Sequence, residues 1–306
     1  SIGVCRLVDW DVDASFYVSL ALLKVHGADA AFISQYSESK AFKEEVDRHS
    51  LLSASPKKIN LGPISDIRLP LPPLPEQKKI AAILSSVDDA IRSTQAVIDQ
   101  ARTLKKGLLG RLLTRGIGHK RFKQTEIGEI PVEWEVRVLE DVTSLMTNGF
   151  VGRAIEHYAE EDDSVWYLQG YNIKANQIIT HGMKRIEKEF HEKQRRSWLK
   201  EGDLLVVQTG DIGATALVPK EFENANCHAL IVVRFLLNVV HPQYACQLFN
   251  SDQMKSRLMK ISTGSTMKHL NTTEVRKLQI PLPPLAEQKQ IAEILSGVDA
   301  VIRQNS

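Results

Sequence analysis

Side chains able to distinguish one base pair from another are grouped in the second half of this 306-residue sequence. Arginine can donate two hydrogen bonds to guanine, and asparagine or glutamine can pair in the same bidentate way with adenine. Trp166, Tyr167 and Tyr171 have rings that could stack on bases, but packing in a core is the interpretation we favour for them. The candidates for base contact are Gln208, Thr209, Asp211, Arg185, Arg195, Arg196, Lys268 and Asn271.

The run from residue 264 to residue 271 is the best of these candidates. Gly264, Ser265 and Thr266 allow the backbone to approach a phosphate closely, while Lys268 supplies a positive charge. The alternative is that this run is a turn that fixes the connection between a helix and a strand.

Three stretches concentrate positive charge. Residues 101–124 hold eight basic and no acidic residues, residues 181–200 hold seven basic and three acidic ones, and residues 253–277 hold six and one. Such clusters neutralise phosphates and provide affinity without sequence information. The alternative is that they are solvated surface faces. The whole chain has a formal charge of only +2, which does not by itself indicate a polyanionic partner.

Motifs for catalysis or metal binding are absent from the sequence. There is no Asn/Asp-Pro-Pro-aromatic turn of an adenine methyltransferase and no GxxxxGK[ST] loop to hold nucleotide phosphates. His228 and Cys227 have no spaced partner for a triad or a metal site. Cys5, Cys227 and Cys246 lie far apart, which favours reduced thiols. We therefore expect no cofactor, no metal and no enzymatic activity in the chain itself.

No apolar run approaches 18 residues, and no leader peptide opens the chain. We therefore expect a cytoplasmic protein without a membrane partner.

A repeat organises the elements that must position the candidate residues. Residues 67–92 and 278–303 match at a constant offset of 211, and Lys57, Ile59 and Asn60 face Lys268, Leu270 and Asn271 at the same offset. A period of that length indicates duplicated domains rather than a solenoid.

Each copy combines a proline-rich segment with a long amphipathic pattern. The prolines favour a stiff, extended segment, and a helix is predicted from Glu76 to about Arg115 and from Glu287 to the chain end. Forty residues of helix span roughly 60 Å, which is typical of a spacer. The alternative is that both helices cover one globular core. The apolar heptad positions include Ile80, Ile83, Val87, Val97, Leu104 and Leu108, with Leu84, Ile91, Ile98 and Leu112 widening the stripe.

Between the helices, the pattern predicts an α+β domain. Strands are expected at residues 134–139, 203–208, 214–218 and 229–235, and helices only later, at 242–260. Residues 1–66 are expected to correspond in sequence only to the later part of this domain. In that alignment, residues 4–7 correspond to 231–235, and residues 13–16 correspond to 241–244. The first domain is therefore expected to be truncated at its N-terminus.

The sequence resembles the specificity subunits of type I restriction-modification systems. The resemblance rests on PLPPLxEQKxIAxIL, which occurs twice, on IGEIPVEW, on residues 202–219 (GDLLVVQTGDIGATALVP) and on residues 264–271 (GSTMKHLN). It implies β-rich target recognition domains that read double-stranded DNA and are joined by long antiparallel coiled-coil helices. It also implies partners: two methyltransferase subunits that bind the helices, and restriction subunits that join indirectly.

The expected division is a partial recognition domain at 1–68, a hinge and long helix at 69–118, a second recognition domain at 119–284, and the start of a second helix at 285–306. Seven apolar residues of the long helix are expected to serve helix packing and methyltransferase binding: Ile80, Ile83, Val87, Ile91, Val97, Leu104 and Leu108. The alternative function is a half-size DNA-binding scaffold that forms a two-fold homodimer through its helices.

Overall fold

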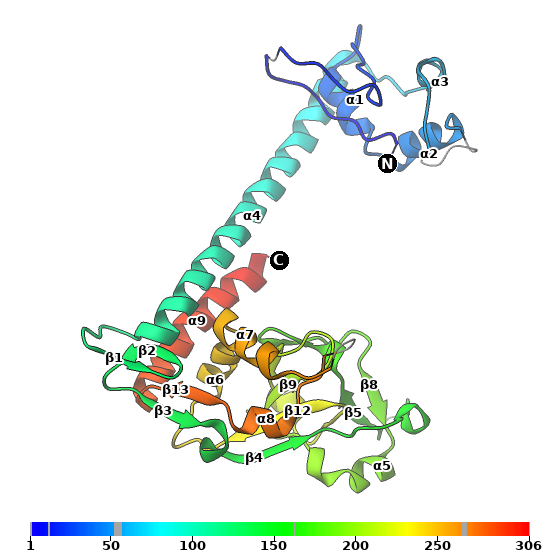
Figure 1. The fold of residues 1–306 in the computed structure, drawn as a ribbon. Helices are drawn as coiled ribbons and strands as arrows, with labels where there is room; N and C mark the ends of the chain where they lie inside the picture. Colours follow the sequence, from blue (N-terminus) through cyan, green and yellow to red (C-terminus); the bar gives the residue numbers. More distant parts are fainter. Residues whose placement is uncertain (1, 12, 52–56, 162, 265–267, 306) are drawn as a thin grey trace. The chain divides into compact units, whose positions relative to one another are not determined.

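The computed structural model describes residues 2–11, 13–51, 57–161, 163–264 and 268–305 (Figure 1). The chain divides into two compact units, residues 1–97 (unit 1) and 98–306 (unit 2). The described part of unit 1 contains no strand. Its helices are α1 (Ala30–Tyr36), α2 (Lys40–Arg48), α3 (Leu61–Ser65) and the first part of α4 (Leu74–Arg115).

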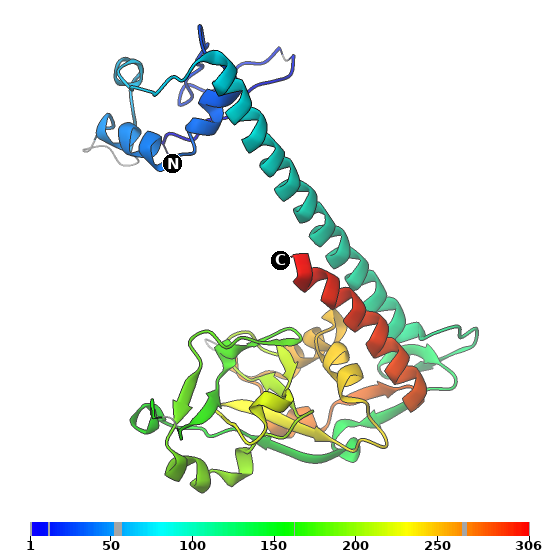
Figure 2. The same ribbon diagram turned by 180° about the vertical axis from the view of Figure 1, so that it is seen from behind.

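Helix α4 is continuous over 42 residues, which confirms the predicted long helix (Figures 1 and 2). At 1.5 Å per residue it is about 63 Å long. It begins at Leu74, two residues before the predicted start, because Pro75 needs no hydrogen-bonded N–H in the first turn. It ends before Gly116, which has a left-handed φ of 62°.

Unit 2 is built on a four-stranded antiparallel sheet, in the order β10-β9-β12-β4. Val232 of the central strand β12 faces Leu205 of β9 and Thr147 of β4. The strands are β4 (Thr143–Asn148), β9 (Leu204–Val207), β10 (Thr215–Leu217) and β12 (Leu230–Phe235). Strands β3 (Glu135–Val138), β9, β10 and β12 confirm the four predicted strand regions, whereas β4 was not predicted.

Smaller sheets complete unit 2. A three-stranded sheet has the order β11-β5-β8, with β5 parallel to β11 and antiparallel to β8, and three antiparallel pairs are β1-β2, β3-β13 and β6-β7. Their bounds are β1 (Phe122–Thr125), β2 (Gly128–Pro131), β5 (Val165–Leu168), β6 (Ile173–Lys174), β7 (Gln177–Ile178), β8 (Lys184–Ile186), β11 (Asn226–Cys227) and β13 (Gln279–Leu282).

Part of the second proline-rich segment is therefore a strand, because β13 includes Pro281 and pairs with β3. A proline is tolerated there because β13 has no second neighbour among the described strands.

The helices of unit 2 are α5 (Lys188–Lys193), α6 (Pro242–Phe249), α7 (Asp252–Ile261), α8 (Thr272–Arg276) and α9 (Leu285–Asn305), with 3-10 turns η1 (Leu139–Val142), η2 (Ile155–His157), η3 (Gly170–Asn172), η4 (Arg195–Ser197) and η5 (Lys220–Phe222). Four of these helices, α6 to α9, pack against one face of the main sheet, whereas α5 packs on the β5–β8 pair. Helix α5 was not predicted. No described helix has the length and apolar character needed to cross a membrane.

Both faces of the main sheet are buried. Leu204, Val206, Ile231 and Val233 pack in one cluster with residues of α6, α7 and α9, whereas Leu205, Val207, Leu230 and Val232 pack in a second cluster on the other face. This two-sided burial explains why β9 and β12 are continuous apolar runs, whereas the edge strand β4 is mixed in character.

Helices α4 and α9 lie side by side and run in opposite directions in unit 2 (Figures 1 and 2). Lys105 of α4 forms an ion pair with Asp299 of α9, and Gln247 of α6 donates to the other oxygen of Asp299 at 2.8 Å. Ile98 and Leu112 of α4 are buried, at 6% and 7% exposure. The fold is thus α+β with long packed helices, as predicted.

Most of the predicted apolar stripe is not covered by the described residues. Ile83, Val87, Ile91, Val97 and Leu104 have exposed fractions between 46% and 61%. Ile80 and Leu108 are half-buried, and of these seven predicted packing positions only Leu108 packs partly against the core of unit 2.

The predicted correspondence between the two units was wrong in its alignment. The N–H of Asp29 and the N–H of His241 each donate at 2.8 Å to the first-turn glutamine of a long helix, so α1 is the counterpart of α6. His241 follows Asp29 by 212 residues. At that offset, residues 18–23, and not residues 4–7, correspond to β12. Residues 4–7 and 18–23 form no strand, because no described strand of unit 1 lies beside them in the way that β4 and β9 flank β12.

Candidate nucleic-acid interface

Two loops meet at one end of the main sheet. Strands β4 and β9 end there and β12 begins there, since neighbouring strands are antiparallel. The loop after β9 is joined to the segment before α8 by a bridge between Thr209 and His269, and the N–H of Leu270 donates to the carbonyl of Gln208 at 3.0 Å. We call residues 208–213 and the described residues of the second segment, 262–264 and 268–271, the paired loops. They bring together Gln208, Thr209, Asp211, Lys268 and Asn271.

Gln208 is buried, so the prediction that it contacts a base is not supported by its position. Its side chain is 1% exposed, and its Nε2 donates to Asn148 Oδ1 at 3.2 Å and to the Leu270 carbonyl at 3.1 Å. Its Oε1 has no hydrogen-bond partner among the described residues. Asn148 also accepts a hydrogen bond from the Thr272 hydroxyl. Asn148 was not among the predicted site residues. In the sequence, it could have been recognised only as a polar residue before Gly149.

The remaining described candidates of the paired loops, Thr209, Asp211, Lys268 and Asn271, are exposed. The Thr209 hydroxyl lies 3.0 Å from His269 Nδ1, and Asp211 lies 4.0 Å from the Lys174 ammonium group. Lys268 is exposed and makes no side-chain hydrogen bond or ion pair with a described residue. Ser265 and Thr266 lie outside the described residues.

Asn271 has a structural role as well as an exposed side chain. Its Oδ1 caps α8 by accepting from the Thr273 N–H at 2.9 Å. Because this bond uses the carbonyl oxygen, the amide nitrogen of Asn271 keeps its donors for other partners. The alternative that the run is a structural turn therefore holds for Asn271, while Lys268 remains a candidate for contact.

The three arginine candidates lie on other elements. Arg185 of β8 faces Trp166 of β5, and its guanidinium carbon lies 4.2 Å from the centre of the indole ring. Arg195 forms an ion pair with Glu192 at 2.9 Å, and Arg196 is exposed. Among the described residues, no hydrogen bond or ion pair connects these arginines to the paired loops.

The aromatic candidates divide by burial. Tyr167 is fully buried, its hydroxyl lies 3.1 Å from His228 Nδ1, and burial raises its pKa. It is a core residue, as we favoured. Trp166 and Tyr171 are 36% and 50% exposed, so their rings remain accessible.

Neither His228 nor the cysteines form a reactive centre in the described residues. Burial lowers the pKa of His228 and therefore favours its neutral form. All three cysteines are free thiols, and burial raises the pKa of Cys246 to about 12, which opposes formation of a thiolate. The described His, Cys, Asp and Glu residues form no group that could hold a metal ion.

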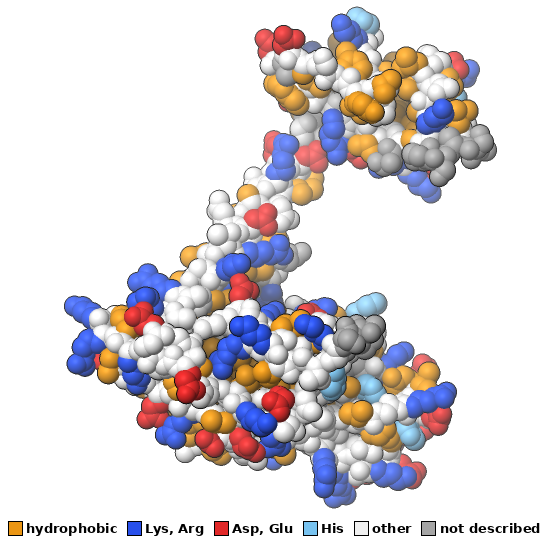
Figure 3. Space-filling view, viewed as in Figure 1, with side chains coloured by type: hydrophobic (Ala, Val, Ile, Leu, Met, Phe, Trp, Pro, Cys, Tyr) orange, Lys and Arg blue, Asp and Glu red, His pale blue; other side chains and the backbone are white. Residues whose placement is uncertain are grey.

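Most of the positive charge in the 101–124 stretch is paired within the chain. Five of its eight basic residues form ion pairs: Arg102 with Asp99, Lys105 with Asp299, Lys106 with Asp252, Arg115 with Glu129, and Arg121 with Glu133. Figure 3 shows basic side chains over the β1–β2 region with acidic ones among them. The acidic partners come mainly from other elements, which a count along the sequence does not reveal.

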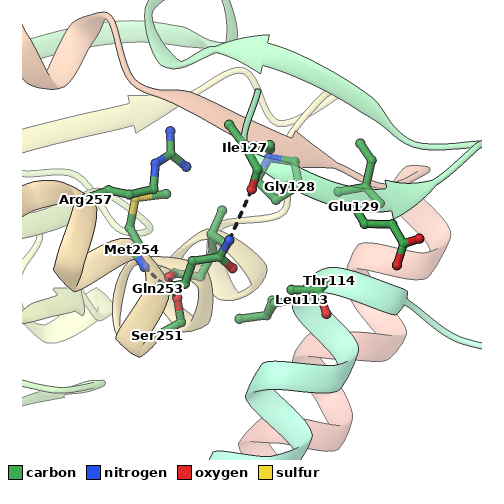
Figure 4. A pocket seen from close by; sticks show the side chains of 12 residues that line it. Leu113, Thr114, Ile127, Gly128, Glu129, Ser251, Gln253, Met254 and Arg257 are labelled. Atoms are coloured by element: carbon green, nitrogen blue, oxygen red, sulfur yellow. Dashed lines mark hydrogen bonds between the residues drawn. The ribbon is translucent and has the colours of Figure 1, made fainter. Parts of the chain in front are cut away.

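The described residues of unit 2 line two cavities of different size. The one in Figure 4 has a volume of about 70 Å³ and lies between the end of α4, the β1–β2 hairpin and α7, where Gln253 donates to the Ile127 carbonyl at 3.2 Å. It is far smaller than the roughly 300 Å³ of typical small-molecule sites. An open groove of about 540 Å³ lies beside α6 and α9 and is lined by polar side chains such as Gln243 and Asp299.

The chain matches known proteins over most of its length. The family model described as type I restriction modification DNA specificity domain matches residues 14–102 and 131–305. The MjaVIII specificity subunit of Methanocaldococcus jannaschii is 30% identical over 243 residues, which are 78% of this chain and 56% of that protein. The EcoBI specificity subunit of Escherichia coli is 22% identical over 268 residues, or 82% of this chain and 56% of that protein. The chain thus spans a little over half the length of these relatives.

Solved structures share the fold. The HsdS subunit from Thermoanaerobacter tengcongensis superposes with a TM-score of 0.51 at 16% identity, over 91% of this chain and 64% of that one. The type I restriction-modification S subunit from M. genitalium gives 0.58 at 15% identity, over 90% and 67%. From the match of the family model to both units, the chain belongs to the type I restriction modification DNA specificity domain family.

Proposed function

We propose that this chain recognises a specific sequence in double-stranded DNA and directs methyltransferase and restriction subunits to it. The observation that carries the proposal is the convergence of the paired loops at one end of the main sheet, with Thr209, Asp211, Lys268 and Asn271 exposed. Exposed polar side chains on a rigid sheet can read base edges, and Lys268 can contact a phosphate. Gln208 then supports these loops from inside.

We propose the following division of work along the chain. Residues 1–68 form part of a first recognition domain, 69–118 form the hinge and long helix, 119–284 form a second recognition domain, and 285–306 begin a second helix. We further infer that catalysis belongs to the partner subunits.

To test recognition, the chain is reconstituted with its candidate methyltransferase and the modified adenines are mapped. We expect one sequence to be modified. Lys268→Ala should weaken binding to all sequences alike, whereas Thr209→Ala should alter the preference at individual positions. Equal binding to all sequences at physiological salt would leave only general DNA affinity and would refute the proposal.

The exposed apolar stripe of α4 supports binding of the methyltransferase subunits. Val87 and Leu104 are 51% and 56% exposed, and large exposed apolar side chains along one helix are typical of a protein interface. We expect Val87→Glu combined with Leu104→Glu to abolish co-purification with the methyltransferase. Unchanged co-purification would refute this role of the helix.

A second candidate function is a half-size scaffold that dimerises through α4. The observation that favours it is a difference in the partners of two equivalent aspartates, Asp299 of α9 and Asp88 of α4, which occupy the same position of the repeat. Asp299 binds both Gln247 and Lys105, whereas the hydrogen-bond donor to Asp88 among the described residues is Gln35, at 2.7 Å. A second copy could cover the exposed stripe beside Asp88. A chain that stays monomeric in light scattering at tens of micromolar would refute this candidate.

A further inference from the structure

A buried glutamine in the first turn of α4 joins three segments of unit 1. Gln77 is 3% exposed. Its Oε1 accepts from the N–H of Asp29 at 2.8 Å, and its Nε2 donates to the carbonyl of Pro72 at 2.7 Å. Asp29 is the N-cap residue of α1. One side chain therefore connects the proline-rich hinge, the start of the long helix and the start of α1.

The same arrangement occurs in unit 2. Gln288 of α9 is fully buried, its Oε1 accepts from the N–H of His241 at 2.8 Å, and its Nε2 donates to the carbonyls of Pro283 and Val239, both at 2.9 Å. His241 is the N-cap residue of α6. Two sites with different surroundings thus use one residue type with the same donor and acceptor pattern.

A second contact along each long helix fixes its rotation. Gln35 of α1 donates to Asp88 of α4 at 2.7 Å, and Gln247 of α6 donates to Asp299 of α9 at 2.8 Å. In both units the contacted aspartate follows the first-turn glutamine by three helical turns, or roughly 16 Å. Two polar contacts separated by that distance constrain the orientation of each long helix relative to α1 or α6.

We propose that Gln77 and Gln288 are positioning residues that set the angle between each recognition module and its long helix, and thereby the separation of the two half-sites accepted on DNA. The inference rests on the proposed function, because the half-sites exist only if the modules read DNA. It requires an amide at each position, since the side chain must accept from a backbone N–H and donate to a carbonyl at the same time.

The first test measures the joint without DNA. Gln288→Met and Gln77→Met remove both polar contacts at similar volume, and hydrogen exchange is followed at the amides of His241 and Asp29. We expect exchange about tenfold faster at His241 in the first variant and at Asp29 in the second, as expected for loss of one hydrogen bond. Gln290→Met, at an exposed position of α9, is the matched control and should change neither amide. Unchanged protection of both amides overturns the proposal.

The second test measures half-site separation with the full chain and its methyltransferase, on DNA in which the mapped half-sites lie at varied distances. We expect the wild type to modify one separation and the variants to modify neighbouring separations as well, with the same base preference within each half-site. If the methionine variants fail to fold, Gln288→Glu and Gln77→Glu replace them, because a carboxylate still accepts from the N–H but cannot donate to the proline carbonyl.

The outcomes separate the two claims. Folded variants that keep the wild-type separation overturn the positioning role, even where exchange is faster. A wild type that modifies DNA without sequence preference refutes the proposed function instead.

Discussion

Loss of the Lys105 ammonium group should destabilise unit 2 by about 3 kcal/mol. The side chains of Lys105 and Asp299 are 15% and 12% exposed, so Lys105→Met leaves a largely buried carboxylate without its cation. Removing one partner of a buried ion pair costs roughly 3–5 kcal/mol. We expect the lower end of that range, because Asp299 keeps its hydrogen bond from Gln247.

Thermal unfolding followed by tryptophan fluorescence measures this effect, since Trp134, Trp166 and Trp198 all lie in unit 2. For a unit of this size, the loss corresponds to a decrease in Tm of roughly 6–12 °C. The matched control is Lys106→Met. The side chains of Lys106 and of its ion-pair partner Asp252 are 80% and 75% exposed. This pair should contribute less than about 1 kcal/mol to the free energy of unfolding.

A further variant tests the mechanism itself. Lys105→Met combined with Asp299→Asn should recover most of the lost stability, because the neutral amide no longer needs a cation while its oxygen still accepts from Gln247. If Lys105→Met costs no more than Lys106→Met, the buried pair does not hold α9 against α4 and the reasoning is refuted.

Three further predictions concern the interior of unit 2. Arg234→Met should cost about 3 kcal/mol in urea unfolding, because it leaves a fully buried aspartate without the guanidinium that holds both its oxygens at 2.7 Å. Burial lowers the pKa of His191 and of His228 below the ordinary 6.5, so these side chains bind protons more strongly in the unfolded chain than in the folded one. The free energy of unfolding should therefore fall as the pH decreases through 6.5. Urea midpoints that stay constant from pH 7.5 to pH 5 would contradict this. Gly149→Ala should lower the Tm, since an added Cβ would lie 2.5 Å from the carbonyl oxygen of Cys227, and an unchanged melting curve would show that this backbone can move apart.

The elements set by local patterns were predictable from the sequence. The long helix follows from the proline-free heptad run between Pro75 and Gly116, and three strands of the main sheet follow from apolar runs such as Leu204–Val207. The fourth strand, β4, is mixed in character and was missed. The sheet order was not predictable, because β9 and β4 both pair with β12 and are separated in sequence by two smaller sheets. Helix α5 has too few residues to show a period.

The candidate site was predictable by region and less so by residue. The run GSTMKHLN and the loop after β9 were both selected, and the structure brings them together. The burial of Gln208 could not be foreseen, because it depends on Leu270 and Asn148, each about 60 residues away in sequence. The correspondence of α1 with α6 was also hidden, because few residues match between them, although Gln35 and Gln247 make equivalent bonds.

The internal pairing of the 101–124 stretch has a consequence for how this protein responds to ionic strength. A cation already bound to a carboxylate displaces no counterions when DNA approaches, so it adds nothing to the dependence of affinity on salt. The five ion pairs offset most of the basic charge of this stretch, and Arg111, Lys120 and Lys123 are left without an ion pair among the described residues. If α4 joins two DNA-reading modules, as we propose, its paired cations add little sequence-independent affinity, and the choice of site is left to the loops.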